Sequence, residues 1–71
     1  SLVEEVVLVG VLGIAFIGAA TRMLKPQGRL TLVANRQMPY EAALEAGFRR
    51  WAKLGEAGGY KLLEAEAPRR G

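Results

Sequence analysis

Few of the side chains that ordinarily carry out chemistry occur in this sequence of 71 residues. It has no His, no Cys and no Asp, and its only Ser is the first residue. Nucleophilic catalysis by a Ser–His–Asp or Cys–His arrangement is therefore excluded. The seven acidic residues are all Glu, and without His none of them has the spacing of a zinc site. The composition predicts no metal centre and no disulfide.

The polar residues best placed for a site follow a short β-rich run at residues 29–35. Apolar residues on both sides of this run predict a strand buried on both faces, inside a parallel or mixed sheet. Asn35 ends the strand, and ligands of open α/β sheets bind beyond such carboxyl ends. Arg36 and Tyr40 belong to the same loop, so all three are candidate site residues. The alternative is that Asn35 only turns the chain and Tyr40 only packs.

The net charge is +3, and the bases are unevenly distributed. Residues 22–36 hold four bases and no acid, among them Arg29 and Arg36 beside the predicted strand. Such a patch could contact RNA phosphates, and Arg29 and Arg36 are the candidate contacts. The alternative is that these are solvated loop charges. The terminal Arg69-Arg70-Gly71 is expected to be a frayed tail.

The first segment, residues 2–24, contains a run of 15 residues without charge, from Val6 to Ala20. The run is shorter than the roughly 18 residues that argue for a membrane span. The acidic Glu4-Glu5 flank is also wrong for a signal peptide. A buried helix is favoured, and a membrane-associated peptide is the less favoured alternative.

This helix is clearest over residues 12–24, where one apolar stripe consists of Leu12, Phe16, either Ala19 or Ala20, and Met23. The β-branched residues before it, Val6 to Val9, fit either a strand or the first turns of the helix. Gly10 is the natural place for a break.

Two further elements follow the central strand. Pro39 suits the first turn of a helix over residues 39–47, and Gly47 suits its C-terminal cap. Residues 50–56 and 60–67 predict a hairpin, because Gly58 and Gly59 supply the positive φ angles of a tight turn. The predicted order is helix, strand, helix, strand, strand, which is an α/β fold.

Several short stretches of the sequence together carry a family resemblance. They are Ala15-Phe16-Ile17, Met23-Leu24-Lys25-Pro26-Gln27-Gly28-Arg29-Leu30, Val33-Ala34-Asn35, Pro39-Tyr40 and Gly58-Gly59-Tyr60-Lys61-Leu62. With the order of elements, they resemble the C-terminal end of a class I S-adenosylmethionine-dependent methyltransferase. The specific resemblance is to the small-domain ribosomal RNA guanine-N2 methyltransferases, which act on 16S RNA. It implies a partial Rossmann-like sheet, S-adenosylmethionine as the family's cofactor and a loop after the central strand that borders the substrate pocket.

The sequence also departs from that family. It has no Gly-x-Gly cofactor loop, no acidic ribose ligand of the family's kind and no Asn-Pro-Pro motif, and Gln27 replaces a usual Gly. The prediction is one small domain over residues 1–71, equivalent to the last third of a methyltransferase domain, with residues 1–11 as a divergent extension. Alone it is expected to bind no cofactor and to be inactive. The alternative function is a structural, oligomerising or weak RNA-binding module, and the expected compartment is the cytoplasm.

Association with a second copy is a further expectation. In the resembling fold the strand at residues 29–35 has a neighbour on each edge, and one neighbour belongs to the absent first half. A bare edge pairs readily with another chain. The sequence therefore predicts a homodimer or higher oligomer through the N-terminal segment and the central strand, unless Val6 to Val9 pairs with a strand edge of its own chain.

Overall fold

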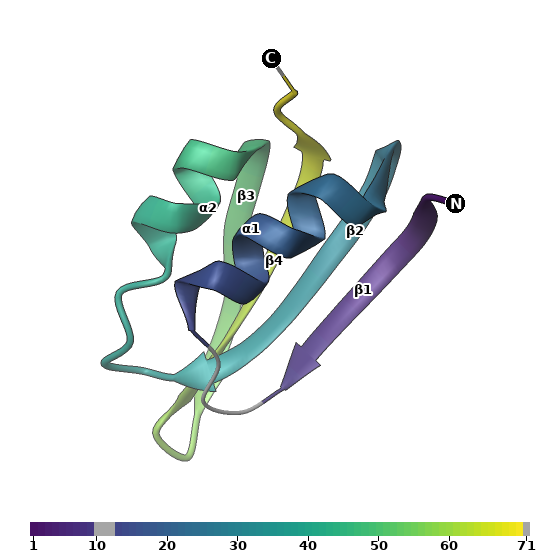
Figure 1. The fold of residues 1–71 in the computed structure, drawn as a ribbon. Helices are drawn as coiled ribbons and strands as arrows, with labels where there is room; N and C mark the ends of the chain where they lie inside the picture. Colours follow the sequence, from purple (N-terminus) through teal and green to yellow (C-terminus); the bar gives the residue numbers. More distant parts are fainter. Residues whose placement is uncertain (10–12, 71) are drawn as a thin grey trace.

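The described part of the chain forms one four-stranded sheet and two helices (Figure 1). The computed structural model describes residues 1–9 and 13–70. The elements, in chain order, are β1 (Val3–Val9), α1 (Ile14–Met23), β2 (Leu24–Asn35), α2 (Glu41–Gly47), β3 (Phe48–Ala57) and β4 (Tyr60–Pro68). The predicted α/β class is confirmed, but the predicted order is wrong at its start, because the chain begins with a strand.

The strands lie in the order β1-β2-β4-β3. β1 runs parallel to β2, with Val6 opposite Leu30 and Leu8 opposite Leu32. β4 lies antiparallel between β2 and β3, so the C-terminal strand returns along the central strand as the sequence predicted.

The N-terminal segment fills the edge of β2 that the sequence left bare. β-branched residues favour strands over helices, and here Val6, Val7 and Val9 form β1 rather than the first turns of the helix. The prediction of a bare edge on the central strand is therefore wrong, because β2 is paired on both sides. The predicted break at Gly10 lies outside the described residues.

Both helices cover the same face of the sheet (Figure 1). Residues of β2 that face them, Leu30, Leu32 and Ala34, are fully buried, whereas Thr31 and Val33 on the other face are only partly buried. The expectation of burial on both faces is thus met on one face alone. The core also contains Ile17, Ala20, Leu24, Tyr40, Leu44, Phe48, Leu63 and Ala65.

The buried stripe of α1 matches the predicted one only at Ala20, which faces the core together with Ile17. Phe16 and Met23, which were predicted to be buried, are 54% and 48% exposed. Leu12, another predicted member, lies outside the described residues. Apolar residues on several sides of the helix left its facing direction ambiguous, and the packing of Ile17 and Ala20 in the core decides it.

Gly47 permits a close approach of the two helices. A Cβ atom there would lie 2.8 Å from Thr21 Cγ2 of α1. Gly47 was predicted as the C-terminal cap of this helix, but α2 ends without a left-handed cap residue. The Phe48 N–H donates to the Leu44 carbonyl, and extended backbone follows. The helix also begins two residues later than predicted, with Tyr40 at its N-cap position.

Residues 25–28 are an irregular part of β2, which is longer than the strand predicted over residues 29–35. Val3 pairs with Leu24 and Glu5 with Arg29, so β2 carries extra residues opposite Glu4. Gln27 is exposed, which explains why this position tolerates a side chain where the resembling family usually has glycine.

The C-terminal hairpin is confirmed. Gly58 and Gly59 have φ angles of 59° and 83°, as a two-residue hairpin turn requires. Both strands are one or two residues longer than predicted at their outer ends.

Candidate functional site

Two parallel strands end at the same edge of the sheet. β1 ends at Val9 and β2 at Asn35, and the loop of residues 36–40 begins at this edge and leads into α2 (Figure 1). The carboxyl ends of parallel strands are where open α/β sheets bind their ligands. This edge is therefore the candidate site, and the loop at residues 36–40 is named the site loop.

Backbone hydrogen bonds fasten the site loop at both ends. The Arg36 N–H donates to the Gly59 carbonyl at 2.8 Å, which ties the loop to the β3–β4 turn. The Met38 N–H donates to the Asn35 carbonyl at 3.0 Å, and the Tyr40 N–H donates to the Met38 carbonyl at 2.9 Å. Such satisfied backbone groups favour one loop conformation over many.

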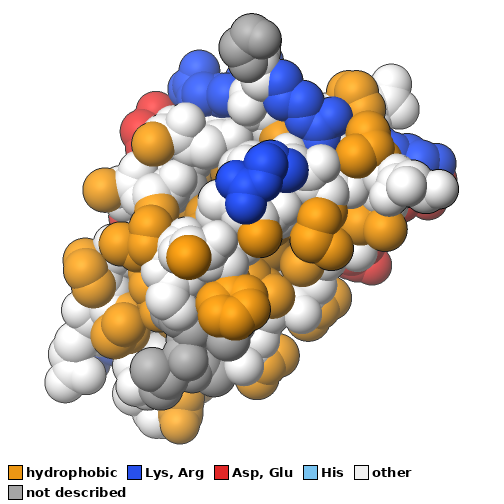
Figure 2. All heavy atoms as spheres, viewed as in Figure 1, with side chains coloured by type: hydrophobic (Ala, Val, Ile, Leu, Met, Phe, Trp, Pro, Cys, Tyr) orange, Lys and Arg blue, Asp and Glu red, His pale blue; other side chains and the backbone are white. Residues whose placement is uncertain are grey.

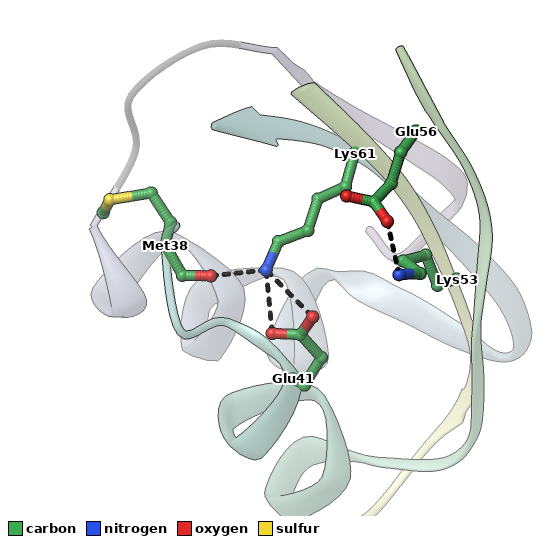
Figure 3. Close-up of polar contacts among 5 residues, drawn as sticks. All are labelled: Met38, Glu41, Lys53, Glu56 and Lys61. Atoms are coloured by element: carbon green, nitrogen blue, oxygen red, sulfur yellow. Dashed lines mark hydrogen bonds and ion pairs between the residues drawn. The ribbon is translucent and has the colours of Figure 1, made fainter. Parts of the chain in front are cut away.

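A buried lysine holds the middle of the loop (Figure 3). Lys61 is 5% exposed, and its Nζ donates to the Met38 carbonyl at 2.6 Å. It also donates to both carboxylate oxygens of Glu41, at 2.9 and 2.8 Å. An ammonium removed from water needs partners for its three N–H groups, and these three oxygens supply them.

The Lys61–Glu41 pair joins β4 to the first turn of α2. Lys61 faces the helices because it is opposite Ala34 in the register of β2 and β4. Its hydrogen bond is the main reason that the pKa of Glu41 is held below its usual range. Glu41 also lies in the first turn of α2, where the helix dipole favours a carboxylate.

The three predicted site residues differ in how deeply they are buried at this edge. Asn35 is partly buried at the end of β2, opposite Tyr60 of β4, and Arg36 is exposed. Tyr40 is 1% exposed and belongs to the core, beneath the site loop. Within the described part of the chain its buried hydroxyl has no hydrogen-bond partner. Asn35 and Arg36 are thus the two that can meet a ligand directly.

Arg29 and Arg36, the candidate RNA contacts, do not form one patch. Arg29 lies at the start of the regular part of β2 and Arg36 directly follows its end, so they are about 23 Å apart at the usual rise per residue. Arg29 lies beside two carboxylates of β4, with Nε 3.6 Å from Glu64 Oε2 and Nη2 3.7 Å from Glu66 Oε2.

Sequence reasoning missed the role of Lys61 and Glu41. The available signal was the alternation of β4: Lys61 shares its face with Leu63 and Ala65, which the sheet buries. A lysine at an inward position needs a carboxylate or carbonyl partner. That rule could have pointed to the nearby loop.

Residues 1–9 and 13–70 hold no group of three or more acidic, His or Cys side chains that could bind a metal ion. Among the described helices, none is long and apolar enough to cross a membrane.

An open α/β sheet with a parallel β1–α1–β2 unit and an antiparallel terminal hairpin defines an α/β domain of mixed-sheet architecture, in which ligands bind beyond the carboxyl ends of parallel strands. Residues 5–64 match the sequence profile of the Methyltransferase small domain (MTS) family. The chain belongs to that family.

Among solved structures, the chain is similar to the T. thermophilus 16S rRNA N2 G1207 methyltransferase (RsmC), whose structure was determined in complex with AdoMet and guanosine. The two share 32% sequence identity with a TM-score of 0.79. The match covers 89% of this chain but 19% of the T. thermophilus enzyme. No curated protein sequence matches the chain.

Proposed function

We propose that this chain forms the C-terminal part of the catalytic domain of an AdoMet-dependent ribosomal RNA guanine-N2 methyltransferase. The observation that carries the proposal is the match over 89% of the chain to an enzyme of that activity. Within the proposal, residues 1–71 correspond to the last third of such a domain, with residues 1–11 as its divergent N-terminal extension. Ribosomal RNA in the cytoplasm is the proposed target.

The proposed contribution of the chain is the substrate side of the site. Asn35 and Arg36 lie at the carboxyl edge of the sheet, and the side-chain amide of Asn35 can donate to or accept from a base edge. Arg36 is exposed and has no carboxylate within salt-bridge distance among the described residues, so it remains available to a phosphate. The network around Lys61 fixes the loop that carries them.

A chimera tests the proposed function. Residues 14–68, from α1 to β4, would replace the aligned segment of the T. thermophilus enzyme, which keeps its own cofactor-binding part. We expect the chimera to methylate 16S RNA at guanine N2. Loss of one side-chain hydrogen bond to the base in Asn35→Ala should lower kcat/KM roughly tenfold.

Lys53→Ala is the matched control, because the Lys53 ammonium on β3 pairs with Glu56 and makes no hydrogen bond to the site loop among the described residues. A folded chimera with no methylation, or one in which Asn35→Ala and Lys53→Ala have equal activity, would contradict the proposed role of this edge.

The chain alone is proposed to bind no cofactor and to transfer no methyl group. The sequence has no Gly-x-Gly loop and no Asp to hold the ribose. Isothermal titration of the 71-residue chain with AdoMet should give no binding heat. Micromolar binding would contradict this part of the proposal.

A further inference from the structure

Three arginines from distant parts of the sequence line one surface hollow at the end of the molecule opposite the site loop. The hollow is lined by Thr21, Arg22, Arg69 and Arg70. Arg22 belongs to the last turn of α1, and the other two follow β4. Figure 2 shows Lys and Arg side chains gathered at the end of the molecule where the C-terminus lies. We call Arg22, Arg69 and Arg70 the arginine cluster.

The described part of the C-terminal tail is held in place, contrary to the expectation that it frays. The backbone turns at Ala67, where φ is 58°, and the Arg69 N–H donates to the Gly47 carbonyl at 2.8 Å. The Arg69 Nε donates to the carbonyls of Glu45 and Phe48, at 3.2 and 3.1 Å.

Arg70 is fixed by α1. Its Nε and Nη2 both donate to the Thr21 carbonyl, at 3.2 and 2.9 Å, across 49 residues of sequence. Carbonyls in the last turn of a helix lack helical partners, so these arginines cap α1 and α2. A guanidinium has five N–H groups, and Arg70 uses one edge of its fork on the carbonyl. Its remaining N–H groups make no hydrogen bond to any residue that the structure describes.

Helix capping does not explain the presence of Arg22 in the cluster, and it does not neutralise the positive charge of the three arginines. Arg22 makes no side-chain hydrogen bond or ion pair with any other described residue. Among the described residues, the carboxylate within salt-bridge distance of the cluster is that of Glu45, 3.7 Å from Arg69 Nη2 and itself well exposed. Helix carbonyls carry only partial charge, so they orient these guanidinium groups without neutralising them.

We propose that the arginine cluster binds a phosphate of an RNA backbone, as a contact surface separate from the site loop. Guanidinium groups match phosphate oxygens in planar geometry, and three of them converge on one hollow. The choice of RNA over another phosphate compound rests on the proposed function, whereas the phosphate site itself rests on the cluster.

Fluorescence anisotropy with a labelled 20-nucleotide RNA hairpin tests the proposal on the 71-residue chain across a series of NaCl concentrations. The double variant Arg22→Gln/Arg70→Gln should bind roughly tenfold more weakly. The slope of log K against log[salt] should also become shallower by about 0.9 for each phosphate that the variant no longer binds. Because Arg22 supports no other group, Arg22→Gln alone keeps the fold and should still give a measurable part of this weakening.

Arg50→Gln is the matched control, because it removes the same charge from β3 at a position opposite Glu66. Equal weakening in this control and in Arg22→Gln would overturn the proposal, since binding would then follow net charge alone. Titration with inorganic phosphate separates the two sources of phosphate. Phosphate binding that Arg22→Gln removes, without any RNA binding, would overturn the RNA assignment. Neither readout requires methyl transfer, so failure here leaves the proposed catalytic family untouched.

Discussion

Among single residues, Lys61 has the clearest energetic consequence, because its ammonium is buried while its three oxygen partners all belong to the site loop and α2. Lys61→Met keeps the apolar stem and removes the donor. The Met38 carbonyl then loses its side-chain hydrogen bond, whereas the carboxylate of Glu41 returns to water. We expect the free energy of unfolding to fall by about 2 kcal/mol, measured by urea denaturation.

Lys53→Met is the control for Lys61→Met. Lys53 donates to Glu56 at 2.7 Å, but both side chains are exposed, and exposed pairs contribute little. It should leave the urea midpoint nearly unchanged. A similar effect of the two substitutions would mean that the burial of Lys61 adds nothing to its ion pair.

Protonation of Glu41 at acidic pH should weaken its ion pair with Lys61, which holds the site loop. The folded-state pKa of Glu41 is lowered, chiefly by the hydrogen bond from Lys61. A lowered pKa stabilises the fold fully above the ordinary value near 4.5 and loses that contribution as the pH falls through the folded value. Wild-type stability, followed by thermal unfolding, should therefore converge on that of Glu41→Gln below about pH 4.5.

The pKa of Glu56 is also lowered, by the Lys53 hydrogen bond, so it titrates in the same acidic range. The difference in stability between wild type and Glu41→Gln isolates the contribution of Glu41, because Glu56 is present in both proteins. A difference that stays constant from neutral pH to pH 3 would show that Glu41 does not stabilise the loop as a carboxylate.

At the level of elements, Gly28 explains why β2 can pair with β1 despite its irregular start. A Cβ atom there would lie 2.8 Å from Leu24 Cδ2, 3.0 Å from the Lys25 carbonyl oxygen and 3.1 Å from the Glu4 carbonyl oxygen. Gly28→Ala should therefore destabilise the fold by about 2 kcal/mol, because two of these three neighbours are backbone atoms that cannot rotate away.

Gly55→Ala is the matched substitution on β3. Nothing lies within 4 Å of the position that its Cβ would take, and its φ is not positive. It should be neutral or slightly stabilising, since alanine reduces the entropy of the unfolded chain. Urea denaturation of both variants distinguishes a steric requirement at Gly28 from a general cost of replacing glycine.

The elements predicted from sequence were those with local signals. The Gly58-Gly59 turn, the apolar alternation of β2 and the apolar spacing of α2 each determine structure within a few residues. β1 was left open between strand and helix because its residues belong to the uncharged run that continues to Ala20, and only pairing with β2 resolves the choice. The Lys61 network depends on contacts across about 20 residues, which periodicity does not contain.

Across the whole molecule, the sheet has one covered and one open face, and β1 and β3 are its two edge strands. Val7 and Val9 are 58% and 66% exposed on β1, and Leu54 is 54% exposed on β3. Valines on an edge strand with unpaired backbone groups favour pairing with another chain. The expectation of self-association therefore moves from the central strand, which is fully paired, to β1.

We predict that two chains associate through β1 in a symmetric antiparallel pair, which would extend the four-stranded sheet across a two-fold axis. A pair centred on Val6 places each Glu5 opposite a Val7, so no like charges meet.

Light scattering coupled to size exclusion should give a dimer at micromolar concentration. Val7→Lys should yield a monomer because a lysine on an edge strand blocks pairing, whereas Leu54→Lys, with the same change on the β3 edge, should remain dimeric. A wild-type monomer would contradict this prediction, because β1 would then pair with β2 and with no second chain. A monomer produced only by Leu54→Lys would place the interface on β3.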